Sequence, residues 1–185
     1  CKKSIREETI DNMKKEIIIQ VDERDRELGP IEKMEAHRNA VLHRAFSILV
    51  FNSKNELLLH KRASDKYHSP NLWTNTCCSH PRFNETLENA IYRRLQEEMG
   101  FSCELKEIFN FIYKIELDDG LFEHEFDHVF IGSYEGEINP NPEEVSDYKW
   151  MTLEDIEKDI SINPSHYTFW FKTLMPEVTK HFKTI

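Results

Sequence analysis

The sequence predicts one α/β (α+β) domain with helices on both sides of a central sheet. Its 185 residues, 39% of them hydrophobic, are enough for one domain with a full core. Strand-like and helix-like segments are interspersed along the chain, which favours an α/β/α layered arrangement. Because no internal repeat or low-complexity segment divides the sequence, we expect a single domain over residues 16–185, preceded by a polar arm over residues 1–15.

Several runs have the alternation or the β-branched and aromatic content of strands. Residues 22–30 are rich in acids and end in Gly29-Pro30, which predicts a loop. The run Arg44–Asn52 is expected to be buried and to form a hairpin with Glu56–Arg62 across Ser53-Lys54-Asn55. The predicted strands are Glu16–Val21, Arg44–Asn52, Glu56–Arg62, Cys103–Leu117, Phe122–Tyr134 and Asp147–Met151, with Asp118-Asp119-Gly120 as the turn between the two longest.

Three segments have helix signals. The clearest is Glu85–Met99, with Asn84 as the expected N-cap and Gly100 as the residue that ends it. Thr152 opens a second helix that extends to Asp159, with acids in its first turn. The pair Asn163-Pro164 opens the last helix, since proline is favoured at the first helical position.

The bulk composition excludes several classes of protein. A net charge of −10 argues against non-specific binding to nucleic acid or to an anionic membrane surface. No apolar run is long enough to span a membrane, and no signal peptide is visible. Two of the four cysteines, Cys77 and Cys78, are adjacent, which makes a poor disulfide framework and favours a reducing, cytoplasmic location.

The stretch Trp73-Thr74-Asn75-Thr76-Cys77-Cys78-Ser79-His80-Pro81 concentrates chemically active side chains. In an extended backbone Cys78 points to the same side as His80, whereas Cys77 points away, so Cys78 and His80 are expected to share one pocket. Simple packing of a buried cysteine is the common alternative. A structural zinc site from Cys77, Cys78 and His80 is a further alternative, but it lacks the usual separated pairs of ligands.

The helix Glu85–Met99 carries charges on its apolar face. Arg94 and Glu98 project into the stripe formed by Leu87, Ala90, Ile91 and Leu95. Burying either charge without a partner is costly, so a buried ion pair between the two is one explanation. The other is that Glu98 faces a metal ion and Arg94 faces an anion.

A second group of ligand-type residues comes from other segments. On the strand Phe122–Tyr134, alternation sends Glu123, Glu125 and Asp127 to one face and His124, Phe126 and His128 to the other. An ordinary half-buried strand with its acids in water explains this segment equally well. If His37, His43 and His80 join Glu123 and Glu125, the resulting N/O site suits Zn²⁺ or Mn²⁺.

The segment from Glu85 to Gly100 resembles the Nudix box, in which acids on a loop and helix hold a divalent cation and a diphosphate. Two positions depart from that pattern. Ser79 replaces the leading glycine, and Arg94 replaces an acid that Nudix hydrolases use. The resemblance therefore implies diphosphate binding and makes diphosphate hydrolysis doubtful.

From about Lys33 to Trp170 the chain resembles the type I isopentenyl-diphosphate isomerases, enzymes of isoprenoid biosynthesis with a Nudix fold. The resemblance rests on several motifs in order and spacing. These are Leu42-His43-Arg44-Ala45-Phe46, Lys61-Arg62-Ala63, Trp73 to Pro81, Arg93-Arg94 through Glu97-Glu98-Met99-Gly100, and Glu123-His124-Glu125. It implies a Nudix-like α/β/α sandwich with a mixed central sheet, and interconversion of isopentenyl and dimethylallyl diphosphate.

The resemblance also implies roles for individual residues. Cys78 and Glu125 would transfer protons with Tyr113 close by, and Trp170 would cover the hydrocarbon, although Phe169 stands where the family usually has proline. A Mn²⁺ or Zn²⁺ ion would be bound by His37, His43, His80, Glu123 and Glu125, and Glu98 would hold a Mg²⁺ that touches the diphosphate. Phosphate oxygens would be bound by Lys33, Arg62, Lys66 and Arg94.

Two other classes of function remain open at this point. One is a Nudix hydrolase of a nucleoside diphosphate derivative. The presence of Arg94, where Nudix hydrolases use an acid, argues against it. The other is a module that binds metal or anions without catalysis. We expect the protein to be a monomer, with a dimer as the alternative.

Overall fold

A computed structural model of the protein describes residues 15–66, 68–117 and 120–183. The predicted arm (residues 1–15, apart from Lys15) and the turn residues Asp118 and Asp119 lie outside this part of the chain. In chain order the elements are β1 (Ile17–Val21), β2 (Glu27–Glu32), α2 (Lys33–Asn39), β3 (His43–Phe51), β4 (Glu56–Arg62), β5 (Trp73–Thr74), β6 (Cys77–Ser79), α3 (Leu87–Met99), β7 (Leu105–Glu116), β8 (Phe122–Ser133), β9 (Val145–Thr152), α4 (Leu153–Ile162), the 3₁₀ turn η2 (Pro164–His166) and α5 (Phe169–Lys183).

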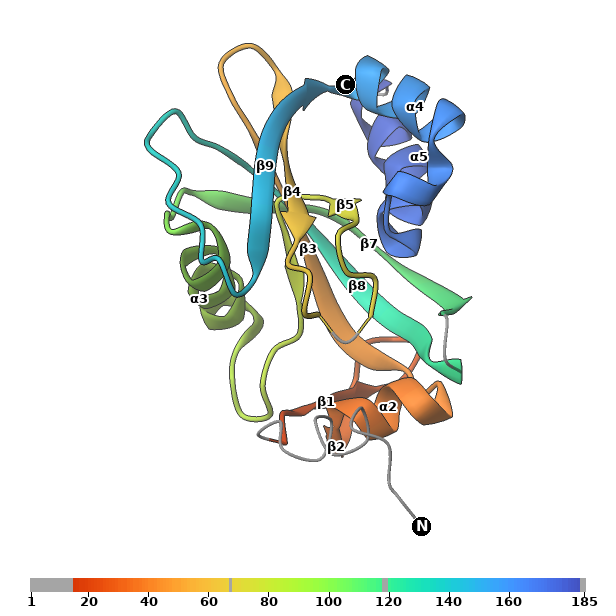
Figure 1. Ribbon diagram of the computed structural model, residues 1–185. Helices are drawn as coiled ribbons and strands as arrows, with labels where there is room; N and C mark the ends of the chain where they lie inside the picture. Colours follow the sequence, from red (N-terminus) through yellow and green to blue (C-terminus); the bar gives the residue numbers. More distant parts are fainter. Residues whose placement is uncertain (1–14, 67, 118–119, 184–185) are drawn as a thin grey trace.

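The strands form one mixed sheet with β3 at its centre (Figure 1). Along one edge β3 runs parallel to β8, from the pair His43–Glu125 to the pair Phe51–Ser133, and β8 pairs with β7 in the antiparallel direction. Along its other edge β3 pairs in turn with β1, β6 and β4, each over a short stretch. The predicted mixed sheet is therefore confirmed.

Helices cover both faces of this sheet, as Figure 1 shows for α3 on one side and for α4 and α5 on the other. The apolar side of α3, including Ile91 and Leu95, packs on Phe46 and Ile48 from β3. On the opposite face Phe171 and Leu174 of α5 pack on Leu49 of β3 and Leu57 of β4. Two apolar cores thus flank the sheet, and the predicted α/β/α layering is confirmed.

The predicted hairpin between β3 and β4 exists only at its turn end. The two strands share the single pair Phe51–Leu57, after which β4 diverges and pairs with β9 along its length. Thr76 fills the gap between the diverging strands, because its Oγ1 accepts a hydrogen bond from Val50 N (2.9 Å) and donates one to Leu58 O (2.8 Å). The chain from Trp73 to Ser79 is therefore wedged between two core strands.

The helix boundaries match the predicted ones at some ends and differ at others. Gly100 ends α3 with a left-handed φ of 75°, as expected, but the N-cap is Thr86, since Asn84 has φ 68° and lies in the preceding turn. Thr152 caps α4 as predicted. The last helix begins at Phe169 instead of Pro164, because Tyr167 is extended and the N–H of Thr168 donates to the carbonyl of Trp73 (3.0 Å).

Two N-terminal elements were not predicted. The expected loop is shorter than residues 22–30, since β2 begins at Glu27 and tolerates Pro30 as an edge strand beside β1. Helix α2 follows directly and is capped by the side chain of Glu32, which accepts from the N–H groups of Met34 and Glu35. Glutamate is an uncommon N-cap, so the sequence carries no strong start signal there.

Candidate active site

The wedged segment from Trp73 to Ser79, with His80 directly after it, places its side chains by strand alternation. Asn75 fixes the backbone, because its Nδ2 donates to the carbonyls of Ile48 (3.2 Å) and Cys77 (2.8 Å). Cys77 is fully buried in the core under α3, whereas Cys78 faces the opposite side of the sheet and lines a cavity with His80. Burial raises the pKa of the Cys78 thiol, which is therefore protonated at neutral pH.

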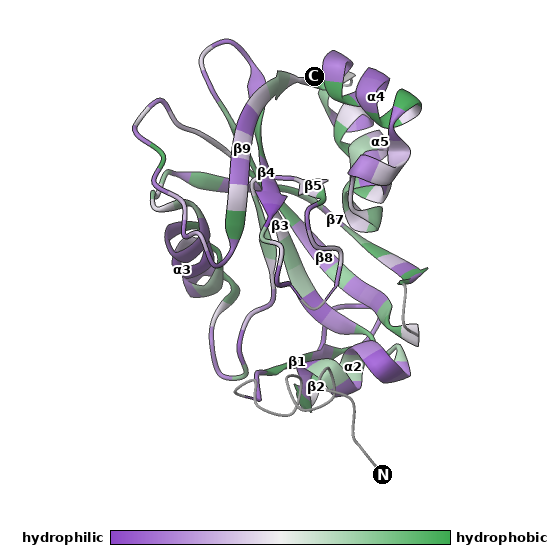
Figure 2. Ribbon diagram, in the orientation of Figure 1, coloured by the Kyte–Doolittle hydropathy of each residue, from purple (hydrophilic) through white to green (hydrophobic). Residues whose placement is uncertain are grey.

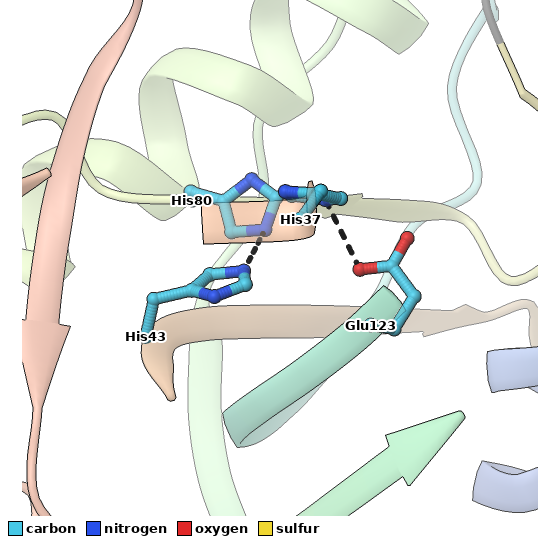
Figure 3. Close-up of side chains that lie close together, drawn as sticks. All are labelled: His37, His43, His80 and Glu123. Atoms are coloured by element: carbon cyan, nitrogen blue, oxygen red, sulfur yellow. Dashed lines mark hydrogen bonds and ion pairs between the residues drawn. The ribbon is translucent and has the colours of Figure 1, made fainter. Parts of the chain in front are cut away.

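Four side chains from separate elements converge beside that cavity (Figure 3). The ligand-type atoms of His37 on α2, His43 on β3, His80 after β6 and Glu123 on β8 all lie within 4.8 Å of one another. The Nε2 atoms of His43 and His80 are 3.2 Å apart, and His37 Nε2 is 3.2 Å from Glu123 Oε2. This is the side-chain group that the sequence predicted as a metal site, with Glu125 directly adjacent.

The donors of this cluster suit a metal ion. His37 Nε2 and Glu123 Oε2 are buried without a hydrogen-bond partner of good geometry, which is costly unless another group binds them. The outer nitrogens of His37 and His43 are each held 2.8 Å from a backbone carbonyl, of Lys33 and Val41, which orients their Nε2 atoms toward the cluster. Burial also lowers the pKa of His80 to about 4, so this imidazole is neutral and able to coordinate.

Glu125 connects this cluster to the cavity. Its Oε1 lies 2.8 Å from His80 Nε2, and its Oε2 accepts a hydrogen bond of 2.5 Å from the hydroxyl of Tyr113, its cross-strand partner on β7. Burial opposes ionisation, but the neighbouring imidazoles of His43 (3.7 Å) and His80 (2.8 Å) outweigh it and hold the pKa of Glu125 well below its usual range. A buried carboxylate is therefore kept charged beside Cys78 and Tyr113.

The other end of the cavity is lined by cations. Arg62, at the end of β4, donates to the carbonyls of His68 and Ser69 (both 3.2 Å). Lys66 forms an ion pair with Glu144, and Arg94 forms one with Glu98. The residues lining the whole cavity are Lys33, Ser47, Arg62, Lys66, His68, Cys78, Ser79, His80, Arg94, Glu98, Tyr113, Glu123, Glu125, Glu144 and Trp170.

Trp170 forms an aromatic wall of the cavity. Its Nε1–H donates to Thr74 Oγ1 at 2.9 Å, and the same oxygen accepts from the hydroxyl of Thr168 at 3.1 Å. The guanidinium carbon of Arg62 lies 5.2 Å from the centre of the indole ring. The indole is thus anchored at one edge on Thr74 and lies beside the Arg62 cation.

The structure brings nearly all of the predicted site residues to one cavity; His37 and His43 lie just behind its wall. Sequence reasoning missed Ser47, His68, Ser79 and Glu144 as lining residues. Ser47 lies four residues after His43 on β3, and strand alternation places the two side chains on the same face. The position of Ser47 could therefore have been predicted from the sequence. His68 and Glu144 lie in loops without periodicity, and no comparable signal marked them. The zinc alternative is not supported, since Cys77 and Cys78 face opposite sides.

Comparison with known proteins agrees with this geometry. A family model described as NUDIX domain matches residues 41–171. The chain is 49% identical over 161 residues to "Isopentenyl-diphosphate Delta-isomerase 2" of Aromatoleum aromaticum, which covers 87% of this chain and 85% of that protein. It is 51% identical over 160 residues to the protein of the same name from Photorhabdus laumondii, covering 86% and 90%.

Solved structures share the fold at much lower identity. DR0079 from Deinococcus radiodurans superposes with a TM-score of 0.73 at 20% identity, over 88% of this chain and 98% of that one. A MutT protein from Methanosarcina mazei gives 0.63 at 18% identity, over 77% and 96%. At these identities the likeness shows the fold alone. Within the described part of the chain, no helix is both long and apolar enough to cross a membrane.

Proposed function

This chain belongs to the isopentenyl-diphosphate Delta-isomerase family within the Nudix superfamily, and we propose that it interconverts isopentenyl diphosphate and dimethylallyl diphosphate for isoprenoid biosynthesis. One observation carries the proposal. A thiol, a charged carboxylate and an indole line one cavity together with the cations Arg62, Lys66 and Arg94, and Arg62 lies beside the indole. An apolar alkene with a diphosphate tail matches this combination of groups.

The reaction adds a proton at one carbon and removes a proton two carbons away. The intermediate is a tertiary carbocation, so two proton-transferring groups must flank the alkene. We assign these transfers to Cys78 and Glu125, with the Tyr113 hydroxyl orienting the carboxylate through their 2.5 Å hydrogen bond. Their resting states, a thiol and a carboxylate, give the pair one proton to move.

The carbocation requires stabilisation without a nucleophile. The face of an indole attracts a cation, by about 2 kcal/mol or more when the site is desolvated. We assign this role to Trp170, whose N–H is anchored on Thr74 within a buried network. The reaction also requires that water be kept from the cation, since water would capture it.

Two metal ions fit the donor sets present. His37, His43, His80 and Glu123, with Glu125 beside them, would hold Zn²⁺ or Mn²⁺ through nitrogen and oxygen ligands. Glu98 would hold a Mg²⁺, which prefers one or two carboxylates together with substrate phosphates. When bound, these ions supply positive charge that orients Glu125 and neutralises the diphosphate.

The cations at the far end bind the unreactive tail. We assign Lys33, Arg62, Lys66 and Arg94 to phosphate oxygens, where guanidinium groups make strong charge-assisted hydrogen bonds. Binding energy from the diphosphate then positions the alkene between Cys78 and Glu125.

The test is isomerisation of isopentenyl diphosphate in deuterated water with divalent metal. The parent protein is expected to incorporate deuterium and to form acid-labile allylic product, and Cys78→Ala is expected to lose both. Cys77→Ala is the matched control, because this neighbouring thiol is fully buried on the other side of the sheet. Absence of incorporation by the parent, together with phosphate release from nucleotide substrates, would favour the hydrolase.

The cellular setting remains a proposal. The described cysteines Cys77, Cys78 and Cys103 are free thiols, which suits a reducing compartment such as the cytoplasm. A monomer stays our prediction, and sedimentation of the purified protein tests it.

A further inference from the structure

Glu144 is a carboxylate at the cationic end of the cavity to which the proposed reaction gives no role. It lies half-buried at the end of the loop before β9 and lines the cavity. Its Oε2 forms an ion pair with the ammonium group of Lys66 and lies 3.5 Å from Nη2 of Arg94. Both of these cations are assigned to the diphosphate, so Glu144 binds the groups that the substrate needs.

The position of Glu144 is built into the fold. Its backbone carbonyl accepts from the N–H of Ala63 (3.0 Å) beside Arg62, and its N–H donates to Asn141 O (3.0 Å). Asn141 N in turn donates to the carbonyl of Glu98 at the end of α3 (2.9 Å). The loop also passes so close to Gly100 that a Cβ there would lie 2.1 Å from the carbonyl oxygen of Asn139.

Glu144 is charged in this setting. Burial opposes its ionisation, but the hydrogen bond from Lys66 and the charge of Arg94 outweigh that effect and lower the pKa of Glu144. Glu98 contacts the same Nη2 atom of Arg94, so two carboxylates stand next to the proposed phosphate-binding groups. A free diphosphate entering here has to displace carboxylates from their cations and meets like charge at close range.

We propose that Glu144 is a specificity-determining residue that makes diphosphate binding depend on a divalent cation. A diphosphate that arrives with Mg²⁺ brings two positive charges, which Glu144 and Glu98 attract, while Lys66 and Arg94 are released to phosphate oxygens. Carboxylate oxygens and substrate phosphates are the ligands that Mg²⁺ prefers, so this donor set fits the ion. Free anions lack the compensating charge and are rejected. This inference rests on the proposed function, because it assumes a diphosphate ligand.

The test uses inorganic pyrophosphate, so that binding is measured without isomerisation. Calorimetric titrations are made with the full chain, once with a chelator and once with saturating Mg²⁺. Glu144→Gln removes the charge and keeps the side-chain size. Glu143→Gln is the matched control, since it removes an equal charge from the exposed neighbouring residue. Glu144→Asp keeps the charge on a shorter side chain, and thermal melts check that each variant is folded.

The parent and Glu143→Gln are expected to bind pyrophosphate much more tightly with Mg²⁺ than without it. Glu144→Gln is expected to bind metal-free pyrophosphate about tenfold more tightly than the parent and to gain less from Mg²⁺. Glu144→Asp should retain the metal dependence. Unchanged or weaker metal-free binding by Glu144→Gln overturns the inference, as does a parent that binds no pyrophosphate. If these binding results hold while the parent fails to isomerise its substrate, only the proposed reaction is wrong.

Discussion

The two ends of the cavity are built in different ways. At the metal end, His43 and Glu123 stand on the neighbouring strands β3 and β8, and Glu123 lies 3.2 Å from His37 (Figure 3). At the cationic end, Arg62 and Arg94 stand on β4 and α3, whereas Lys66 and Glu144 come from loops and form an ion pair. Proton transfer needs fixed geometry, whereas anion binding tolerates loop residues because charge acts over longer distances.

Within the metal end, two carboxylates on the same face of β8 differ in charge. Glu125 is kept ionised by His43 and His80. Burial raises the pKa of Asp127 well above its usual range, and the charge of Glu125 raises it further, while its one hydrogen bond comes from Ser47 (2.9 Å). Equal burial therefore gives opposite protonation states, since the partners decide which carboxyl carries the charge.

The largest expected effect comes from removing the charge of Glu125 and comparing it with the same change at the neutral Asp127. Glu125→Gln should lower kcat by about 10³-fold or more, because it removes a proton-transferring carboxylate. Asp127→Asn should lower kcat only a few-fold, because an amide replaces a carboxyl that is already neutral. The measurement is the rate of acid-labile product formation at saturating substrate. Equal losses in both variants would contradict the assigned protonation states.

The next effect concerns the metal itself. His37→Ala should reduce the affinity for the bound Zn²⁺ or Mn²⁺ by about 100-fold, since one ligand of the cluster is lost. His124→Ala is the control, because alternation on β8 turns His124 away from Glu123 and its Nδ1 lies 2.8 Å from Ala40 O. Metal content after dialysis against a weak chelator measures both. Full retention of metal by His37→Ala would remove this residue from the ligand set.

Residues on strands were easier to place from the sequence than residues in loops. Alternation correctly separated Cys78 from Cys77 and set Glu125 apart from His124, since a strand side chain has only two directions. Figure 2 shows that β8 is mostly polar over its first half and apolar further along, a change along the strand that alternation alone does not explain. The role of Thr76 between β3 and β4 was not predictable, because it depends on two strands diverging, which is a tertiary event.

Family resemblance supplied the cations that local patterns did not single out. Lys66 and Arg62 precede irregular backbone, where periodicity gives no direction for a side chain. The ion pair between Lys66 and Glu144 joins residues 78 positions apart. No local signal identifies such a partner, so the sequence did not predict that Glu144 pairs with Lys66.

A smaller effect is expected at the cationic end. Arg62→Lys should raise KM for the diphosphate about tenfold with little change in kcat, because lysine keeps the charge but loses the planar fork and the contact with Trp170. Lys61→Arg is the control on the neighbouring strand position, since Lys61 is not among the residues that line the cavity. Initial rates over a range of substrate concentrations separate the two constants. A fall in kcat alone would place Arg62 in the chemical step.

The smallest effect tests a cation at the boundary between the two ends. Lys33 lines the cavity and pairs with Glu16 (2.9 Å), while its carbonyl holds His37 of the metal cluster. Burial opposes ionisation of Glu16, but Lys33 outweighs it and lowers the pKa of Glu16 from 4.5 to about 2. The unfolded state therefore takes up this proton first, so the stabilisation is full above pH 4.5 and is lost as the pH falls toward 2.

Partial exposure of both side chains reduces this stabilisation to about 1–2 kcal/mol. Urea unfolding should therefore show Glu16→Gln less stable than the parent at neutral pH, with the difference shrinking as the pH approaches 2. Glu23→Gln, which removes an exposed carboxylate from the nearby turn, should match the parent throughout. A difference that stays constant with pH would mean that Glu16 acts through packing.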